Sequence, residues 1–266
     1  MASITKIMTC LVSLRLLKKY NFNSKKLYFS VSNQASTSTG TTANLKYNEW
    51  YTVNDLLYGL MLPSGNDCAI SLAENFGCIL YFAKQGQFKM LEGIDSVDVL
   101  DDYYVGTYVQ LFVKEMNNIA QEFKLKSTKF TNPHGLSDKM NRSTCNDLAF
   151  ITQKALQQHE FRKIVQAKYH VAYYKKLSIQ NQQEYKNEWV NTNKLLDKGN
   201  YFGVKTGITN SAGSCLSSLY CDYIKEINQD VNIIIVVLGS FKADGRFDDT
   251  ESIVEWYIKQ LKDGSI

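Results

Sequence analysis

Ser3 and Lys6 are the first residues of the chain that could perform chemistry together. On a helix, side chains three positions apart lie on the same face, one turn from each other. A serine hydroxyl is a poor nucleophile until a base takes its proton, and a lysine with a lowered pKa can be that base. If a helix begins at Ser3, its N-terminal partial charge also favours developing negative charge there. We therefore predict Ser3 as a nucleophile and Lys6 as its base.

A second group of polar residues, Ser64-Gly65-Asn66, follows Pro63 at the predicted connector between two helices. Such a connector can present both side chains to a cleft. The Ser64 hydroxyl could relay a proton between Lys6 and a leaving group. The amide of Asn66 could hold a substrate carbonyl and hydrogen-bond to Lys6. Taken alone, the triplet also fits a helix stop followed by an N-cap.

Lys205-Thr206-Gly207 follows a strand-like segment and could bind a carboxylate. Lys205 supplies charge, Thr206 a hydroxyl, and Gly207 lets a ligand approach the backbone closely. An extended substrate could pair with this strand. The N–H of Ile208 and that of Ser3 could form an oxyanion hole, where one donor contributes roughly 3 kcal/mol of transition-state stabilisation. Taken alone, this triplet fits an ordinary strand end.

Each triplet occurs by chance in many proteins. In this order, however, Ser-x-x-Lys, Ser-x-Asn and Lys-Thr-Gly are the signature of serine enzymes that are acylated by a D-alanyl peptide or a β-lactam. The spacing in the sequence does not show that the three converge, so the surrounding elements must bring them together.

The first 160 residues or so are predicted to be mostly helical, from apolar residues at helical spacing and two capping-box patterns. The boxes are Thr52–Asp55 and Thr144–Asp147. The Ser- and Thr-rich segment from about residue 30 to 50 is predicted to be a surface loop. The predicted helices cover residues 3–20, 53–62, 67–76 (with Gly77 as a possible end), 105–124 and 145–157.

The rest of the chain is richer in strand-like segments, and residues 233–238 are apolar and β-branched enough for a central strand. Strands and helices are segregated, which favours an α+β fold over alternating βαβ units. We expect one domain over residues 1–266, with a helical lobe to about residue 165 and an antiparallel-sheet lobe from about 166. The predicted strands are 169–174, 188–192, 201–204, 214–223 and 231–241, followed by a helix over 248–262.

Composition argues against several other classes of protein. The net charge of +4 is small and spread along the chain, so we expect no nucleic-acid partner. The sequence contains no run of about 18 apolar residues, so we predict no membrane span. The six cysteines form no C-x-x-C pair and none has metal-ligand spacing to a histidine, so we expect no metal or cofactor.

Residues 1–17 could be taken for a signal peptide, because one lysine precedes a mostly apolar run. Arg15 interrupts that run, however, and no small-x-small cleavage site follows. We therefore favour a core helix here and expect no export signal in this chain, which leaves the compartment unassigned.

The chain closely resembles the D-alanyl-D-alanine carboxypeptidases, the low-molecular-mass penicillin-binding proteins of peptidase family S11. The resemblance covers nearly the whole chain. Arg246, before the last helix, resembles an arginine that helps to hold the substrate's terminal carboxylate. The resemblance is carried by ASITKIMT, LMLPSGNDCAISLAE, KFTNPHGLSD followed by STCNDLA, and NTNKLL followed by GVKTGITNSAGSCL.

This resemblance implies a β-lactamase/transpeptidase-like fold, with the site between a helical lobe and an antiparallel sheet flanked by helices. It implies metal-free hydrolysis of the terminal D-alanine of a peptidoglycan-type peptide through an acyl-enzyme on Ser3. The partners would be a D-Ala-D-Ala-terminated peptide or a β-lactam, and we expect a monomer. The family places one or more strands before the Ser-x-x-Lys helix, so we expect a truncated N-terminus and a sheet without its first strands.

Two other functions stay open on the sequence. One is a catalytically inactive homologue that keeps a peptide-binding cleft. The other is a β-lactamase, which is less favoured because no glutamate stands out that would activate water for rapid deacylation. His134 resembles a family position, but we interpret it as a turn residue that the proposed chemistry does not need.

Overall fold

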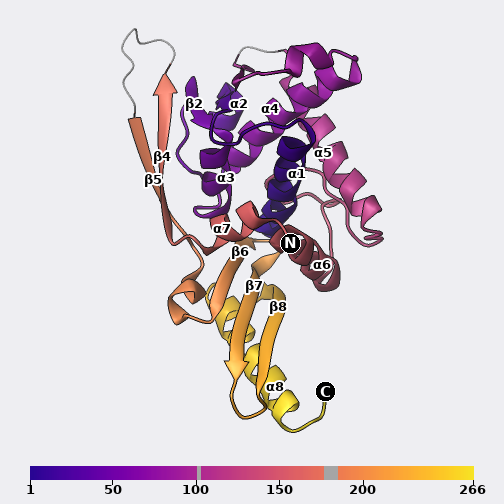
Figure 1. Cartoon of the computed structure of the whole chain (residues 1–266), viewed down its shortest axis with the longest axis vertical. Coiled ribbons are helices and arrows are strands. Elements are labelled where there is room, and N and C mark those ends of the chain that lie inside the picture. Colours follow the sequence, from indigo (N-terminus) through magenta and orange to yellow (C-terminus); the bar gives the residue numbers. More distant parts are fainter. Residues whose placement is uncertain (101–102, 177–184) are drawn as a thin grey trace.

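The computed structural model describes residues 1–100, 103–176 and 185–266, and it combines helices with two β-sheets (Figure 1). The α+β class predicted from the sequence is therefore confirmed. Among the described residues, no helix is both long and apolar enough to cross a bilayer. The α-helices are α1 (Thr5–Lys19), α2 (Asn33–Ser36), α3 (Val53–Met61), α4 (Asn66–Lys84), α5 (Val105–Glu122), α6 (Cys145–Leu156), α7 (His159–Gln166) and α8 (Gly245–Lys262).

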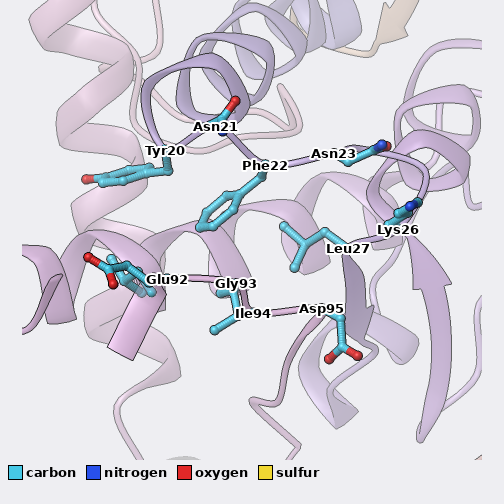
Figure 2. A pocket seen from close by; sticks show the side chains of 11 residues that line it. Tyr20, Asn21, Phe22, Asn23, Lys26, Leu27, Glu92, Gly93, Ile94 and Asp95 are labelled. Carbon is cyan, nitrogen blue, oxygen red and sulfur yellow. The ribbon is translucent and has the colours of Figure 1, made fainter. Parts of the chain in front are cut away.

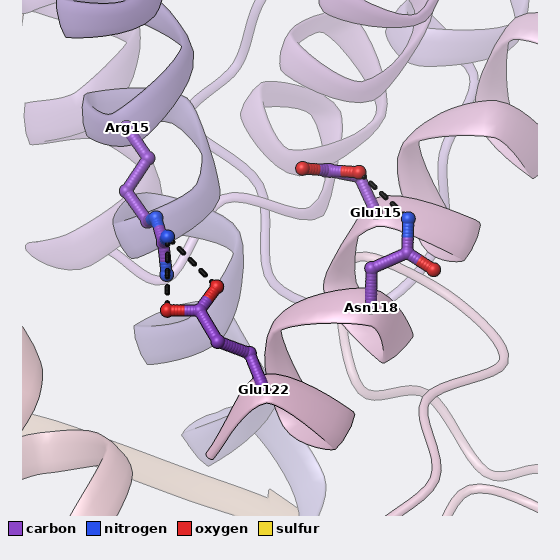
Figure 3. A network of polar contacts seen from close by, with 4 residues as sticks. All are labelled: Arg15, Glu115, Asn118 and Glu122. Carbon is purple, nitrogen blue, oxygen red and sulfur yellow. Dashed lines mark hydrogen bonds and ion pairs between the residues drawn. The ribbon is translucent and has the colours of Figure 1, made fainter.

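Helix α1 lies in the middle of the helical part of the molecule, against α3, α4, α5, α6 and α7. Nearly all of its residues up to Leu17 are consequently buried, which explains the almost uninterrupted apolar run in the sequence. Arg15 is the half-exposed exception, and its guanidinium bonds the carboxylate of Glu122 on α5 at 2.8 Å (Figure 3). A short 3-10 turn, η1 (Ala2–Ile4), precedes α1 and carries Ser3.

The N-cap bonds of both predicted capping boxes are confirmed, because the hydroxyls of Thr52 and Thr144 accept the backbone N–H groups of Asp55 and Asp147. The predicted end of a helix at Gly77 is wrong, since α4 continues to Lys84. Gly77 permits close packing of α4 against α5. A Cβ at this position would lie 2.0 Å from the carbonyl oxygen of Tyr108 on α5.

Five strands form one sheet in the order β3-β1-β2-β4-β5. Strands β1 and β2 flank the segment that was predicted to be a loop, and both were missed because they are only three and four residues long. The hairpin of β4 and β5 projects from the side of the molecule (Figure 1). The bounds are β1 (Tyr28–Ser30), β2 (Glu49–Thr52), β3 (Ser96–Val97), β4 (Tyr169–Lys176) and β5 (Tyr185–Val190).

The other sheet has the order β6-β7-β8, is antiparallel, and comprises β6 (Tyr201–Thr209), β7 (Gly213–Ile224) and β8 (Gln229–Ser240). Helix α8 covers one face, and the helical part of the molecule covers the other (Figure 1). On β7, Cys215 therefore joins the main core while Leu216 packs toward α8. Since both faces are covered, β8 can be apolar at successive positions. Two 3-10 turns complete the fold, η2 (Phe88–Leu91) and η3 (Lys194–Lys198).

Candidate active site

The amine of Lys6 lies among three oxygen atoms from three separate segments. Its Nζ is 3.0 Å from Ser3 Oγ, 2.7 Å from Asn66 Oδ1 and 2.8 Å from the carbonyl oxygen of His134. Lys6 is fully buried, whereas Ser3 is partly exposed. The structure thus brings the serine of the first motif and the asparagine of the second onto one lysine.

Burial lowers the pKa of Lys6 to about 7, while the nearby Asp67 and Cys68 act to raise it. A neutral amine has two N–H groups and one lone pair. If the N–H groups donate to Asn66 and His134, the lone pair is left for the hydroxyl proton of Ser3. The geometry therefore suits a lysine that accepts a proton from Ser3 near neutral pH.

The turn that supplies the His134 carbonyl is docked onto the start of α1. The Thr9 hydroxyl donates to the Pro133 carbonyl at 2.6 Å, and a Cβ on Gly135 would lie 2.0 Å from the carbonyl oxygen of Ala2. Gly135 also has φ +89°, which favours glycine. The His134 ring accepts the Leu136 N–H at its Nδ1, and burial together with the charge of Lys6 lowers the pKa of the ring to about 4. The hydrogen bond that His134 makes to Lys6 is through its backbone carbonyl, which a motif of side chains could not reveal.

Asn66 is the first residue of α4, and both ends of its amide are bonded. Its Nδ2 donates to the Thr39 carbonyl at 2.6 Å, so its Oδ1 is the end that faces Lys6. Ser64 is also buried, but its hydroxyl makes no hydrogen bond within the described part of the chain. The relay between Ser64 and Lys6 proposed from the sequence is therefore not a direct contact here.

The third motif lies on β6 beside the start of α1. A Cβ on Gly207 would be 2.9 Å from the backbone nitrogen of Ser3. The Arg246 guanidinium donates to the Gly207 carbonyl at 3.0 Å, and the Thr206 hydroxyl is 2.7 Å from that of Thr192. The structure thus brings Gly207 to the backbone of Ser3, and Arg246 to Gly207. Ile208, the predicted oxyanion donor, follows Gly207 on β6 and is half-exposed.

Lys205 is buried, and its Nζ donates to the neighbouring Thr206 carbonyl at 3.1 Å. Burial holds its pKa well below the usual value, and the positive charges of Lys6 and Arg246 act in the same direction. Within the described residues, neither Lys205 nor Arg246 forms an ion pair with a carboxylate, and the buried Arg246 Nε has no hydrogen-bond partner. The Asp244 carboxylate acts to raise the pKa of the partly buried Arg246 without forming an ion pair with it. An arriving anion would favour the charged form of Lys205 and could bond to the free N–H of Arg246.

The described residues show no metal site, and a cavity lies away from the motif residues. Among the described residues, no group of three or more His, Cys, Asp or Glu side chains is placed to hold a metal ion. A cavity of about 600 Å³ lies beyond the C-terminal end of α1, lined by Phe22, Leu27 and Ile94 among others (Figure 2). None of the predicted site residues lines this cavity.

A family model described as D-alanyl-D-alanine carboxypeptidase, peptidase family S11, matches residues 1–79 and 96–242. The chain belongs to this family. The family consists of serine hydrolases, and its mechanism proceeds through an acyl-enzyme. The resemblance seen in the sequence motifs is thereby confirmed.

Similar proteins include D-alanyl-D-alanine carboxypeptidase DacF of Bacillus subtilis, which is 30% identical over 220 residues. The D-alanyl-D-alanine carboxypeptidase of Streptomyces sp. (strain K15) is 28% identical over 256 residues, covering 96% of this chain and 77% of that protein. The crystal structure of the Streptomyces K15 DD-transpeptidase superposes with a TM-score of 0.77, covering 96% of this chain and 86% of the other. The β-lactamase/transpeptidase-like fold is thus confirmed.

The length of the match differs between these relatives. The region aligned with DacF covers 82% of this chain but only 46% of DacF. It spans less than half of that relative and about three quarters of the Streptomyces carboxypeptidase.

Proposed function

We propose that the protein is a serine-type D-Ala-D-Ala carboxypeptidase that removes the terminal D-alanine from peptidoglycan-type peptides. The observation that carries this proposal is the 3.0 Å contact between Ser3 Oγ and a buried Lys6 whose pKa is about 7. Membership of the carboxypeptidase family supports the choice of substrate.

In the first step, Ser3 Oγ attacks the carbonyl carbon of the penultimate D-alanine while its proton passes to Lys6. The oxyanion would be held by the N–H groups of Ser3 and Ile208. When the C–N bond breaks, the amine of the terminal D-alanine takes up the proton, with Ser64 as the proposed relay from Lys6. The products are an ester on Ser3 and free D-alanine. Water then hydrolyses the ester and regenerates the serine.

The terminal carboxylate of the substrate is assigned to the cationic region beside β6. Lys205 and Arg246 would supply positive charge there, and Thr206 a hydroxyl. Asn66 would hold the peptide carbonyl with the part of its amide not committed to Lys6 and Thr39. We propose that the whole of residues 1–266 acts as one domain and works as a monomer.

The proposal is tested by incubating the purified protein with a peptide ending in D-Ala-D-Ala and measuring free D-alanine. We expect release by the wild type and none by Ser3→Ala. A fluorescent penicillin should label the wild type covalently and leave Ser3→Ala unlabelled. Saturable peptide binding without acylation would instead support the inactive binding homologue, and rapid turnover of a chromogenic cephalosporin would support a β-lactamase.

A further inference from the structure

The backbone at Ser64 has a conformation that a serine rarely adopts. Its φ is +66°, in the left-handed region, where an L-residue other than glycine is disfavoured by roughly 1 kcal/mol or more. Such a conformation persists when surrounding contacts hold it in place. Ser64 lies in the short link between α3 and α4, two residues before Asn66, so contacts that hold its backbone also set the start of the second motif.

Thr41 makes two contacts that span this motif. Its hydroxyl donates to the Ser64 carbonyl at 2.8 Å, and its own carbonyl accepts the Asn66 N–H at 2.8 Å. Thr41 therefore hydrogen-bonds to the motif on both sides of Gly65. It touches neither Ser3 nor Lys6 through a hydrogen bond.

The segment that carries Thr41 is itself fixed by buried contacts. The Asp67 carboxylate accepts the N–H groups of Ala43 and Leu45 at 2.9 and 3.0 Å. The indole of Trp189, on β5, donates to the Ala43 carbonyl at 2.9 Å. Residues 39–45 are thus anchored to α4 and to the β4–β5 hairpin, although most of their side chains are polar.

We infer that Thr41 is a positioning residue for the second motif. Its hydroxyl holds Ser64 in the left-handed conformation, and its carbonyl holds the first turn of α4, from which Asn66 reaches Lys6. The catalytic consequence rests on the proposed acylation of Ser3, whereas the conformational one does not.

The test compares Thr41→Val, Thr41→Ser and Thr42→Val in the rate of acylation by a fluorescent penicillin. Thr42 is a matched control, because its hydroxyl contacts only Asn44 within the same segment, at 3.3 Å. We expect Thr41→Val to slow acylation about tenfold, the effect of one hydrogen bond on the transition state. Thr41→Ser should stay within twofold of the wild type, and so should Thr42→Val. All three should unfold within a few degrees of the wild type.

Crystal structures of the same variants supply a readout that does not depend on activity. Ser64 should leave its conformation near φ +66° in Thr41→Val but keep it in Thr41→Ser and Thr42→Val. The same Ser64 conformation in all three, or equal rates for Thr41→Val and Thr42→Val, would overturn the inference. If the wild type itself is not acylated, the proposed function fails, and the crystal structures alone decide the role of Thr41. Thr41→Ala replaces Thr41→Val should the latter not fold.

Discussion

The two lysines of the motifs, Lys6 and Lys205, are both buried and both have a lowered pKa, yet their surroundings differ. Lys6 has three oxygen neighbours, all of them uncharged groups. Lys205 donates to one carbonyl next to it in sequence, and its further charged neighbours are the cations Lys6 and Arg246.

This difference shows how one residue type can serve two purposes in one site. When Lys6 is neutral, its two N–H groups have acceptors in Asn66 and His134. The neutral form is therefore accommodated, and Lys6 can act as a base. Lys205 has hydrogen-bonding capacity left over and no counter-ion among the described residues, so an arriving carboxylate would favour its charged form. We therefore propose proton transfer for Lys6 and anion binding for Lys205.

The largest expected effect comes from removing the base. Lys6→Met should reduce acylation of Ser3 by at least about a thousandfold, because the hydroxyl then loses its proton acceptor. Stopped-flow or time-course labelling with a fluorescent penicillin measures the rate. Lys18→Met is the matched control, since Lys18 lies on the same helix but is exposed, and it should react at the wild-type rate. Substantial acylation of Lys6→Met would remove the distinction between the two lysines.

A smaller and more selective effect is expected at Lys205. Lys205→Met should lower kcat/KM about a hundredfold for a peptide with a free C-terminal carboxylate, because a charge-assisted contact is lost. For the same peptide with a C-terminal amide, Lys205→Met and the wild type should differ little. Lys6→Met should affect both substrates alike, and an equal loss of both substrates in Lys205→Met would contradict the assignment.

The contact between β6, which carries Lys205, and the segment that carries Ser3 can be tested at Gly207. Gly207→Ala should slow acylation by about tenfold, because the added Cβ would lie 2.9 Å from the Ser3 nitrogen and push the nucleophile's backbone away from β6. Gly106→Ala serves as control. It lies in α5 with open space around its Cβ position, and it should be as active as the wild type and slightly more stable.

The smallest effect concerns a buried acid away from the motifs. Burial raises the pKa of Glu74 to about 7, and only one of its carboxylate oxygens is bonded, by the Ser32 hydroxyl. A carboxyl with a raised folded-state pKa stabilises the fold fully below its unfolded value and loses that contribution as the pH rises through 7. Glu74→Gln should therefore raise the free energy of unfolding by about 2 kcal/mol more at pH 8 than at pH 5. Urea titrations at both pH values measure this, with the exposed Glu92→Gln expected to show no such difference.

Much of the fold followed from local patterns in the sequence. The helix at Ser3, both capping boxes, the apolar strand at 233–238 and the C-terminal helix all have strong signals of their own. The continuation of α4 past Gly77 had no such signal, because the reason for the glycine is the backbone of Tyr108 on another helix. The short strands β1 and β2 depend likewise on partners far along the chain.

The sequence predicts the side chains of the candidate site but not the backbone groups that contact them. The carbonyl of His134 and that of Thr39 orient Lys6 and Asn66, and a carbonyl is present at every position of any sequence. The segment around Thr41 was predicted to be a surface loop from its composition. Its polar residues are in fact where the chain contacts the second motif.

We propose above all that Lys6, neutral near pH 7, activates Ser3. The most direct test is the rate of acylation by a fluorescent penicillin as a function of pH, with the labelled residue identified by peptide mapping. We predict an adduct on Ser3 and a rate that rises about tenfold per pH unit below 7 and levels off above it, because only the unprotonated amine accepts the proton. A rate that does not change with pH between 5 and 9, or an adduct on a residue other than Ser3, would contradict the claim.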